Sequence, residues 1–144
     1  MLVGMDTGPV ATPSALVPAA PAAVLLVEPD DDNREMYGQF LTYSGFRGFN
    51  VSSADEALPI ADKADVIVTD VRLPGAMDGL TFVARLRGDE RTRHIPIIVL
   101  TACVSEECRE GAVAAGCNLF LQKPCLPDVL VSKIQHVLNT TPLH

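Results

Sequence analysis

Residues 65–70 read DVIVTD, a mainly apolar run between two aspartates. A strand that is apolar on both faces is typical of a parallel sheet covered by helices on both sides. Similar apolar runs occur at 24–28, 96–101 and 118–122, and a weaker one at 48–52. These runs predict five strands.

Helical patterns separate the five runs. The spacing of apolar residues and the helix start and stop signals predict helices at 31–44, 54–62, 79–88, Ser105 to Gly116, and 127–138. In the first of these, Met36, Phe40 and Tyr43 fall on one side at helical spacing. Strands and helices alternate strictly, so we predict an α/β fold in which five helices cover both faces of a five-stranded parallel sheet.

The length of 144 residues predicts one domain, and the content of 48% hydrophobic but only 5% aromatic residues predicts an aliphatic core. We expect a disordered Pro/Ala-rich extension at 1–22, the domain at 23–140 and a tail at 141–144. The extension lacks the basic and apolar regions of a signal peptide. A net charge of −7 argues against direct binding to nucleic acid or an anionic membrane. Without a run long enough to cross a membrane, we expect a cytoplasmic protein.

The four cysteines are Cys103, Cys108, Cys117 and Cys125. Their spacing contains no C-x-x-C pair, and no histidine lies at ligand distance in the sequence. We therefore predict buried or half-exposed thiols and disfavour metal or redox use.

Polar residues stand where four of the predicted strands end: Glu28, Asp70, Thr101 and Lys123. In open parallel sheets the ligand site lies beyond the carboxyl ends of the strands, so these residues should converge. Two carboxylates, a hydroxyl and an ammonium suit phosphoryl transfer, with Asp70 as the nucleophile and a divalent cation bound by Glu28 and Asp70. Each residue alone also has a simpler interpretation, as a cap, a turn residue or a solvated lysine.

Over roughly residues 23–139, the sequence resembles the receiver domain of two-component response regulators. The matching pieces are VLLVE followed by DDDNRE, DVIVTDVRLPGAMDGL, IPIIVLTA and FLQKP, in the family's order and spacing. The resemblance implies a doubly wound, flavodoxin-like fold with strand order 2-1-3-4-5.

The resemblance also implies roles for individual residues. Asp70 becomes the phosphoacceptor, Lys123 the phosphate-contacting lysine and Thr101 the switch hydroxyl that moves toward the phosphoryl group. Phe120 falls at the family's aromatic switch position, although it could instead be an ordinary core phenylalanine. The peptide bond between Lys123 and Pro124 is expected to be cis, as is usual in the family.

The metal site departs from the family pattern, which ends the first strand with two adjacent acids. Here Glu28 is followed by Pro29, which offers no ligand atom on its side chain and no backbone donor. The expected Mg²⁺ ligands are Glu28, Asp70 and the backbone carbonyl of Arg72. Asp30 could act as a substitute ligand, but a helix cap is favoured. The Arg72 side chain could pair with either carboxylate or point to solvent.

The implied function is two-component signal transduction, by a switch domain and not an enzyme. A histidine kinase or phosphotransfer protein would phosphorylate Asp70. Output would pass to a downstream protein or a second copy through the face formed by the last two helices and the strand between them. Pro29 raises the alternative of a pseudo-receiver, a constitutive binding module with weak or no use of metal and phosphate. A haloacid-dehalogenase-type phosphatase is disfavoured, because Arg72 stands where that class needs a second aspartate.

Overall fold

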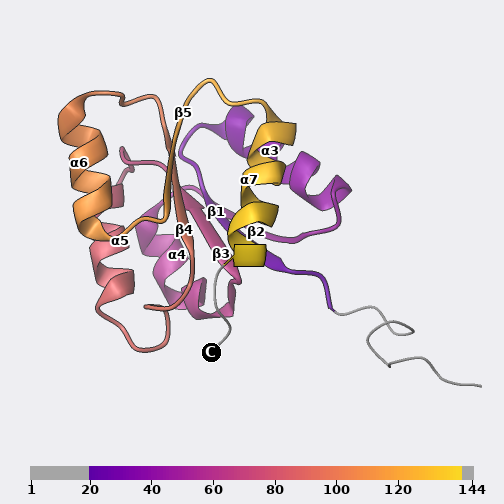
Figure 1. Cartoon of the computed structure of the whole chain (residues 1–144), viewed down its shortest axis with the longest axis horizontal. Coiled ribbons are helices and arrows are strands. Elements are labelled where there is room, and N and C mark those ends of the chain that lie inside the picture. The colour runs from indigo at the N-terminus through magenta and orange to yellow at the C-terminus, as the bar shows by residue number, and fades with distance from the viewer. Residues whose placement is uncertain (1–19, 141–144) are drawn as a thin grey trace, which may run out of the picture.

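A five-stranded parallel sheet forms the centre of the protein (Figure 1). The computed structural model describes residues 20–140, so the expected tail at 141–144 and most of the expected extension at 1–22 lie outside the described residues. The strands are β1 (Ala23–Val27), β2 (Arg47–Val51), β3 (Val66–Thr69), β4 (Ile97–Thr101) and β5 (Leu119–Gln122). Their order is β2-β1-β3-β4-β5, which confirms the predicted topology.

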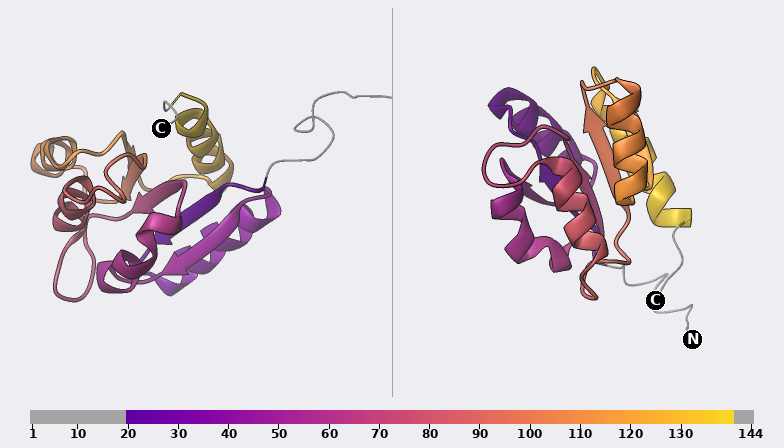
Figure 2. Two further views of the ribbon diagram at one scale, coloured as in Figure 1. Left: turned by 90° about the horizontal axis from the view of Figure 1, so that it is seen from below. Right: turned by 90° about the vertical axis from the view of Figure 1, so that its left-hand side faces the viewer.

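Helices cover both faces of the sheet (Figures 1 and 2). The helices α3 (Asp31–Tyr43) and α7 (Pro127–Thr140) lie on one face, and the other carries α4 (Ala54–Ala57), the 3₁₀ helix η1 (Leu58–Lys63), α5 (Gly79–Arg87) and α6 (Glu106–Ala115). The predicted helix at 54–62 is thus an α-helical turn that continues as a 3₁₀ helix. Pro59 explains the change, since its ring nitrogen cannot donate the next α-helical hydrogen bond.

Two hydrophobic clusters hold the layers together. Along β1, Leu25 and Val27 pack with α4, α5 and α6, whereas Val24 and Leu26 pack with α3 and α7. All four side chains are buried, which agrees with a strand that is apolar on both faces. The polar residues at the strand ends therefore border this aliphatic core.

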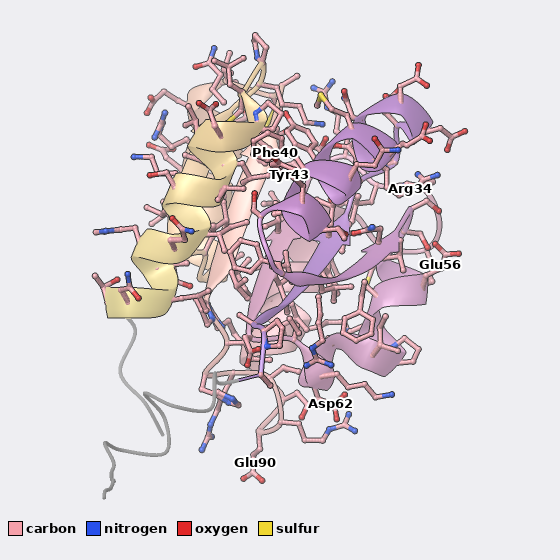
Figure 3. The ribbon with its side chains drawn as sticks, turned by 90° about the vertical axis from the view of Figure 1, so that its right-hand side faces the viewer. Arg34, Phe40, Tyr43, Glu56, Asp62 and Glu90 are labelled. Atoms are coloured by element: carbon pink, nitrogen blue, oxygen red, sulfur yellow. A yellow bond between two sulfur atoms is a disulfide. The ribbon has the colours of Figure 1, made fainter. Side chains whose placement is uncertain are left out.

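The α3 helix turns a different side to the core than its most obvious apolar spacing suggests. Tyr37 and Leu41 are buried, whereas Met36 is 41% and Tyr43 87% exposed. Phe40 and Tyr43 form a tilted aromatic pair, with ring centroids 6.4 Å apart, where α3 comes close to α7 (Figure 3). The side that Met36, Phe40 and Tyr43 share is therefore largely a surface feature.

Side-chain caps fix where the helices begin. The caps of α3, α4, α5 and α6 are Asp30, Ser53, Asp78 and Ser105, each accepting a backbone N–H from the first turn. Each cap satisfies a backbone N–H that has no partner within the helix, and so fixes the residue at which the helix begins. No helix between residues 20 and 140 is long and apolar enough to span a membrane.

Candidate functional site

Three charged side chains meet at the carboxyl end of the sheet. The Lys123 Nζ lies 2.6 Å from Glu28 Oε1 and 2.8 Å from Asp70 Oδ2. Glu28 is 2% and Asp70 8% exposed. The predicted convergence of these residues is present, and one ammonium holds two buried carboxylates together.

The charge state of Lys123 follows from this arrangement. Burial alone would lower the pKa of the ammonium, but hydrogen bonds and charge attraction from Asp70 and Glu28 outweigh it. The pKa of Lys123 is therefore raised above its usual value, and the side chain stays cationic at physiological pH.

Asp70 is held by its own backbone neighbourhood. Its Oδ1 accepts the N–H of Val71 at 2.6 Å and that of Arg72 at 3.4 Å. Gly79, the first residue of α5, donates its N–H to the Val71 carbonyl at 2.7 Å. A Cβ on Gly79 would overlap the Asp70 carbonyl oxygen, so only glycine lets α5 begin against this loop. This close approach of α5 to the loop after β3 fixes the backbone at Asp70, and with it the position of the carboxylate.

Thr101 ends β4 and is 1% exposed. Its Oγ1 accepts the N–H of Cys103 at 3.1 Å, and its carbonyl accepts the N–H of Lys123 at 2.8 Å. The peptide bond between Lys123 and Pro124 is cis, which confirms that expectation. Thr101 is thus linked by its backbone to the lysine that contacts Asp70.

The segment after β1 uses its acids in different ways. Glu28 Oε2 accepts the Asp30 N–H at 3.0 Å, while Asp30 Oδ2 accepts the Asn33 N–H at 2.8 Å. The Asp30 carboxylate is therefore engaged as the cap of α3, the role that the sequence favoured for it. Pro29 stands between them, and its side chain offers no ligand atom.

The oxygen atoms present fit a magnesium ion held by few protein ligands. The described chain, residues 20–140, has no cluster of three or more Asp, Glu, His or Cys side chains arranged for a metal. Glu28, Asp70 and the Arg72 carbonyl would still supply hard oxygen ligands, and Mg²⁺ usually keeps several waters beside one or two carboxylates. Both carboxylates pair with Lys123, whereas the Arg72 guanidinium lies 3.7 Å from the Cys103 sulfur. Lys123, and not Arg72, therefore provides the positive charge beside the two carboxylates.

A disulfide joins Cys103 and Cys108, with Cα atoms 6.2 Å apart. The prediction of free thiols is wrong for these two residues and confirmed for Cys117 and Cys125, which are free and half-buried. The sequence did not predict this disulfide, because two cysteines five residues apart form no recognised motif. The two sulfurs meet only because the loop after β4 folds back onto the first turn of α6.

Phe120 lies on β5 and is half-buried against the cluster that includes α5 and α6. The Arg109 guanidinium carbon lies 4.8 Å from the centroid of its ring, close enough for a cation–π interaction. Phe120 is thus neither fully buried in the core nor freely exposed.

Residues 24–135 match the family model of the response regulator receiver domain. The chain belongs to this family. Five parallel strands in the order found here are also the architecture of solved receiver domains.

Three relatives illustrate the relationship. A cyclic di-GMP phosphodiesterase of Thermotoga maritima is 34% identical over 121 residues, covering 84% of this chain and 32% of that protein. The polar-differentiation response regulator DivK of Brucella anthropi is 30% identical over 121 residues, covering 83% of this chain and 98% of DivK. The solved receiver domain of the sensor histidine kinase PA1611 of Pseudomonas aeruginosa, with magnesium in its active site cleft, is 32% identical. It superimposes with a TM-score of 0.77 over 84% of this chain and 100% of that one.

This receiver domain therefore works in two-component signal transduction. The alternative of a pseudo-receiver is not favoured by these comparisons. Receiver domains generally act as switches and typically bind Mg²⁺. The chain spans only about a third of the phosphodiesterase, whose catalytic name describes that much longer protein.

Pro29→Asp is expected to raise the magnesium affinity of this receiver domain by about tenfold. A carboxylate beside Glu28 would add an oxygen ligand and a negative charge facing a divalent cation, worth ~1.4 kcal/mol or more. Calorimetric titration with magnesium chloride measures the change. Pro29→Ala is the matched control, because it removes the proline ring without adding a ligand. Equal affinities for all three proteins would show that position 29 does not limit metal binding.

Proposed function

We propose that this receiver domain accepts a phosphoryl group on Asp70 from a phosphohistidine of a histidine kinase or a phosphotransfer protein. The observation that carries the proposal is the buried Asp70 carboxylate at the end of β3, paired at 2.8 Å with a lysine held cationic by two acids. A carboxylate oxygen would form the new bond to phosphorus while the bond from phosphorus to the histidine nitrogen breaks.

The residues around Asp70 are suited to the charge that the phosphoryl group brings. The Lys123 ammonium can pair with the new negative charge of the phosphoryl group, because its Nζ already contacts the Asp70 carboxylate. Thr101 can donate its hydroxyl proton to a phosphoryl oxygen once its side chain turns toward Asp70. Its hydroxyl oxygen now accepts the Cys103 N–H, so this turn exchanges one hydrogen bond for another.

Magnesium would be held by Glu28, Asp70 and the Arg72 carbonyl. When bound, the ion supplies charge neutralisation at a phosphoryl oxygen. The two carboxylates and Lys123 carry a net charge of about −1 together, which leaves attraction for a cation. Because Lys123 already pairs with both carboxylates, its ammonium would compete with the ion for their oxygens.

A pocket of about 510 Å³ opens beside Lys123 and offers a path for the phosphodonor. Its lining combines Met36 and Tyr37 of α3 with the segment from Pro124 to Pro127. A mainly apolar recess next to a phosphorylation site suits a protein donor, which must bring its histidine close while excluding water.

Output would pass through the face formed by α6, β5 and α7. Large apolar side chains are exposed on or beside these elements, with Val113 at 62%, Leu126 at 67% and Val129 at 40%. The Arg109 guanidinium of α6 lies over the ring of Phe120 on β5, so a change in the ring position would alter this face. The occupant of the face would be a downstream protein or a second copy of the domain.

The proposal is tested by incubating the full chain with acetyl phosphate and weighing the intact protein. We expect a gain of one phosphoryl mass that increases with magnesium concentration and disappears slowly as the acyl phosphate hydrolyses. Chelating the magnesium with EDTA should slow the gain. A protein that takes up no phosphoryl group even at high magnesium would contradict the proposed function.

A further inference from the structure

The disulfide between Cys103 and Cys108 closes a small ring at the start of α6. Its Cα separation of 6.2 Å lies within the normal range for a disulfide. Ser105, the cap of α6, lies inside this ring: its Oγ accepts the Cys108 N–H at 3.2 Å and lies 3.9 Å from the Cys103 sulfur. The cross-link therefore ties the loop after β4 to the first turn of the helix that follows.

This ring is in direct contact with the phosphorylation site. The Cys103 N–H donates to the Thr101 hydroxyl oxygen at 3.1 Å, and the Cys103 sulfur lies 3.7 Å from Arg72 Nη2. The Arg72 N–H in turn approaches Asp70 Oδ1 at 3.4 Å. One cysteine thus touches both the proposed switch hydroxyl and the residue two positions beyond the proposed phosphoacceptor.

The paired cysteines differ from the other two in where they lie, not in how exposed they are. All four are partly buried, but Cys103 lies in the loop after β4 and Cys108 in the first turn of α6, with their sulfurs joined. Burial raises the pKa of the Cys117 and Cys125 thiols, which makes them less reactive at neutral pH. Because the sulfurs of Cys103 and Cys108 already meet, thiol–disulfide chemistry is expected at this pair, which adjoins Thr101.

We propose that Cys103 and Cys108 are a reversible redox site that governs how readily the Thr101 segment rearranges when Asp70 is phosphorylated. The inference rests on the proposed function of Asp70. In the oxidised form the ring restricts the backbone next to Thr101, because a disulfide removes conformations otherwise open to the loop. In the reduced form Cys103 can move away from the Thr101 hydroxyl and release it toward the phosphoryl group.

The redox step balances with a small-molecule disulfide, such as oxidised glutathione, as the oxidant. One cysteine sulfur attacks it and forms a mixed disulfide, releasing one glutathione thiolate, and the second cysteine displaces the other. The two protein thiols lose two electrons and two protons, and the oxidant leaves as two thiols. Disulfides in a reducing compartment are usually transient and regulatory, which suits a switch of this kind.

The test compares the full chain after reduction with dithiothreitol and after oxidation with glutathione disulfide. Peptide mapping should find residues 103 and 108 linked only in the oxidised sample. Phosphorylation by acetyl phosphate with magnesium should be about threefold or more slower in that sample. Cys108→Ser should show the rate of the reduced wild type under both conditions, and Cys117→Ser, the matched control at a free cysteine outside the donor pocket, should keep the redox dependence.

The outcomes separate the two proposals. If the reduced wild type takes up no phosphoryl group, the proposed function fails and the regulatory inference with it. If both redox forms of the wild type are phosphorylated at one rate while the linkage is present, the redox inference alone is overturned. It is likewise overturned if oxidation links other cysteines or none.

Discussion

Asp70→Asn is expected to abolish phosphorylation by acetyl phosphate while leaving the fold intact. The amide has the size of the carboxylate but is not a nucleophile toward phosphorus, so no acyl phosphate can form at residue 70. The amide can still accept the N–H of Val71, which donates to Asp70 Oδ1 at 2.6 Å in the wild type. Intact mass after incubation with acetyl phosphate and magnesium measures the loss, and urea unfolding checks the fold.

Asp32→Asn is the matched control for this substitution. Asp32 is an exposed acid in the first turn of α3, so its replacement makes the same chemical change away from β3. We expect it to be phosphorylated like the wild type. Full phosphorylation of the Asp70→Asn protein would place the acceptor on another residue.

Lys123→Ala is expected to destabilise the fold and to slow phosphorylation about a hundredfold. The substitution leaves Glu28 and Asp70 buried, close together and without their shared cation. Removing one partner of a fully buried ion pair typically costs ~3–5 kcal/mol. Because the lysine side chain is 13% exposed, we expect a loss of about 2–3 kcal/mol in the free energy of unfolding. Urea unfolding measures the loss, which added magnesium should partly reverse.

The contribution of Lys123 to stability should depend on pH in one direction. Its pKa in the folded protein is raised above the usual 10.5, so the contribution is fully present below that value and is lost as the pH rises through the folded pKa. The difference in stability between the wild type and Lys123→Ala should therefore be constant from neutral pH to about pH 9 and shrink in more alkaline buffer. Lys133→Ala, which removes an exposed lysine of α7, should show neither the loss nor the pH dependence.

The fold was largely predictable, because strong local signals agree with the tertiary structure. The DVIVTD run contains β3 (Val66–Thr69), and Gly116, predicted to end a helix, adopts a φ of 112° after α6. The inner side of α3 was harder, since this helix carries apolar residues on more than one side. Tyr37 is buried and donates its hydroxyl proton to the Cys125 carbonyl, a contact across 88 positions that no local pattern contains.

The candidate site was predictable as a set of residues and less so as a set of contacts. Because the carboxyl ends of parallel strands lie at one edge of the sheet, the sequence predicted that these four residues lie close together: Glu28, Asp70, Thr101 and Lys123. It could not say that Lys123 would pair with both carboxylates, since that depends on how far each side chain reaches. The contact between Arg72 and Cys103 and the disulfide itself depend on how the loop after β4 folds, which sequence spacing does not encode.

The central claim is that the phosphoryl group resides on Asp70, and chemical mapping of the wild type tests it most directly. Borohydride reduces an aspartyl phosphate to homoserine, which tandem mass spectrometry locates within a peptide. After treatment with acetyl phosphate and magnesium, we expect homoserine at position 70, and none there when acetyl phosphate is omitted. Reduction at another acid, or at no residue in a protein that has gained the phosphoryl mass, would contradict the assignment of Asp70 as the phosphoacceptor.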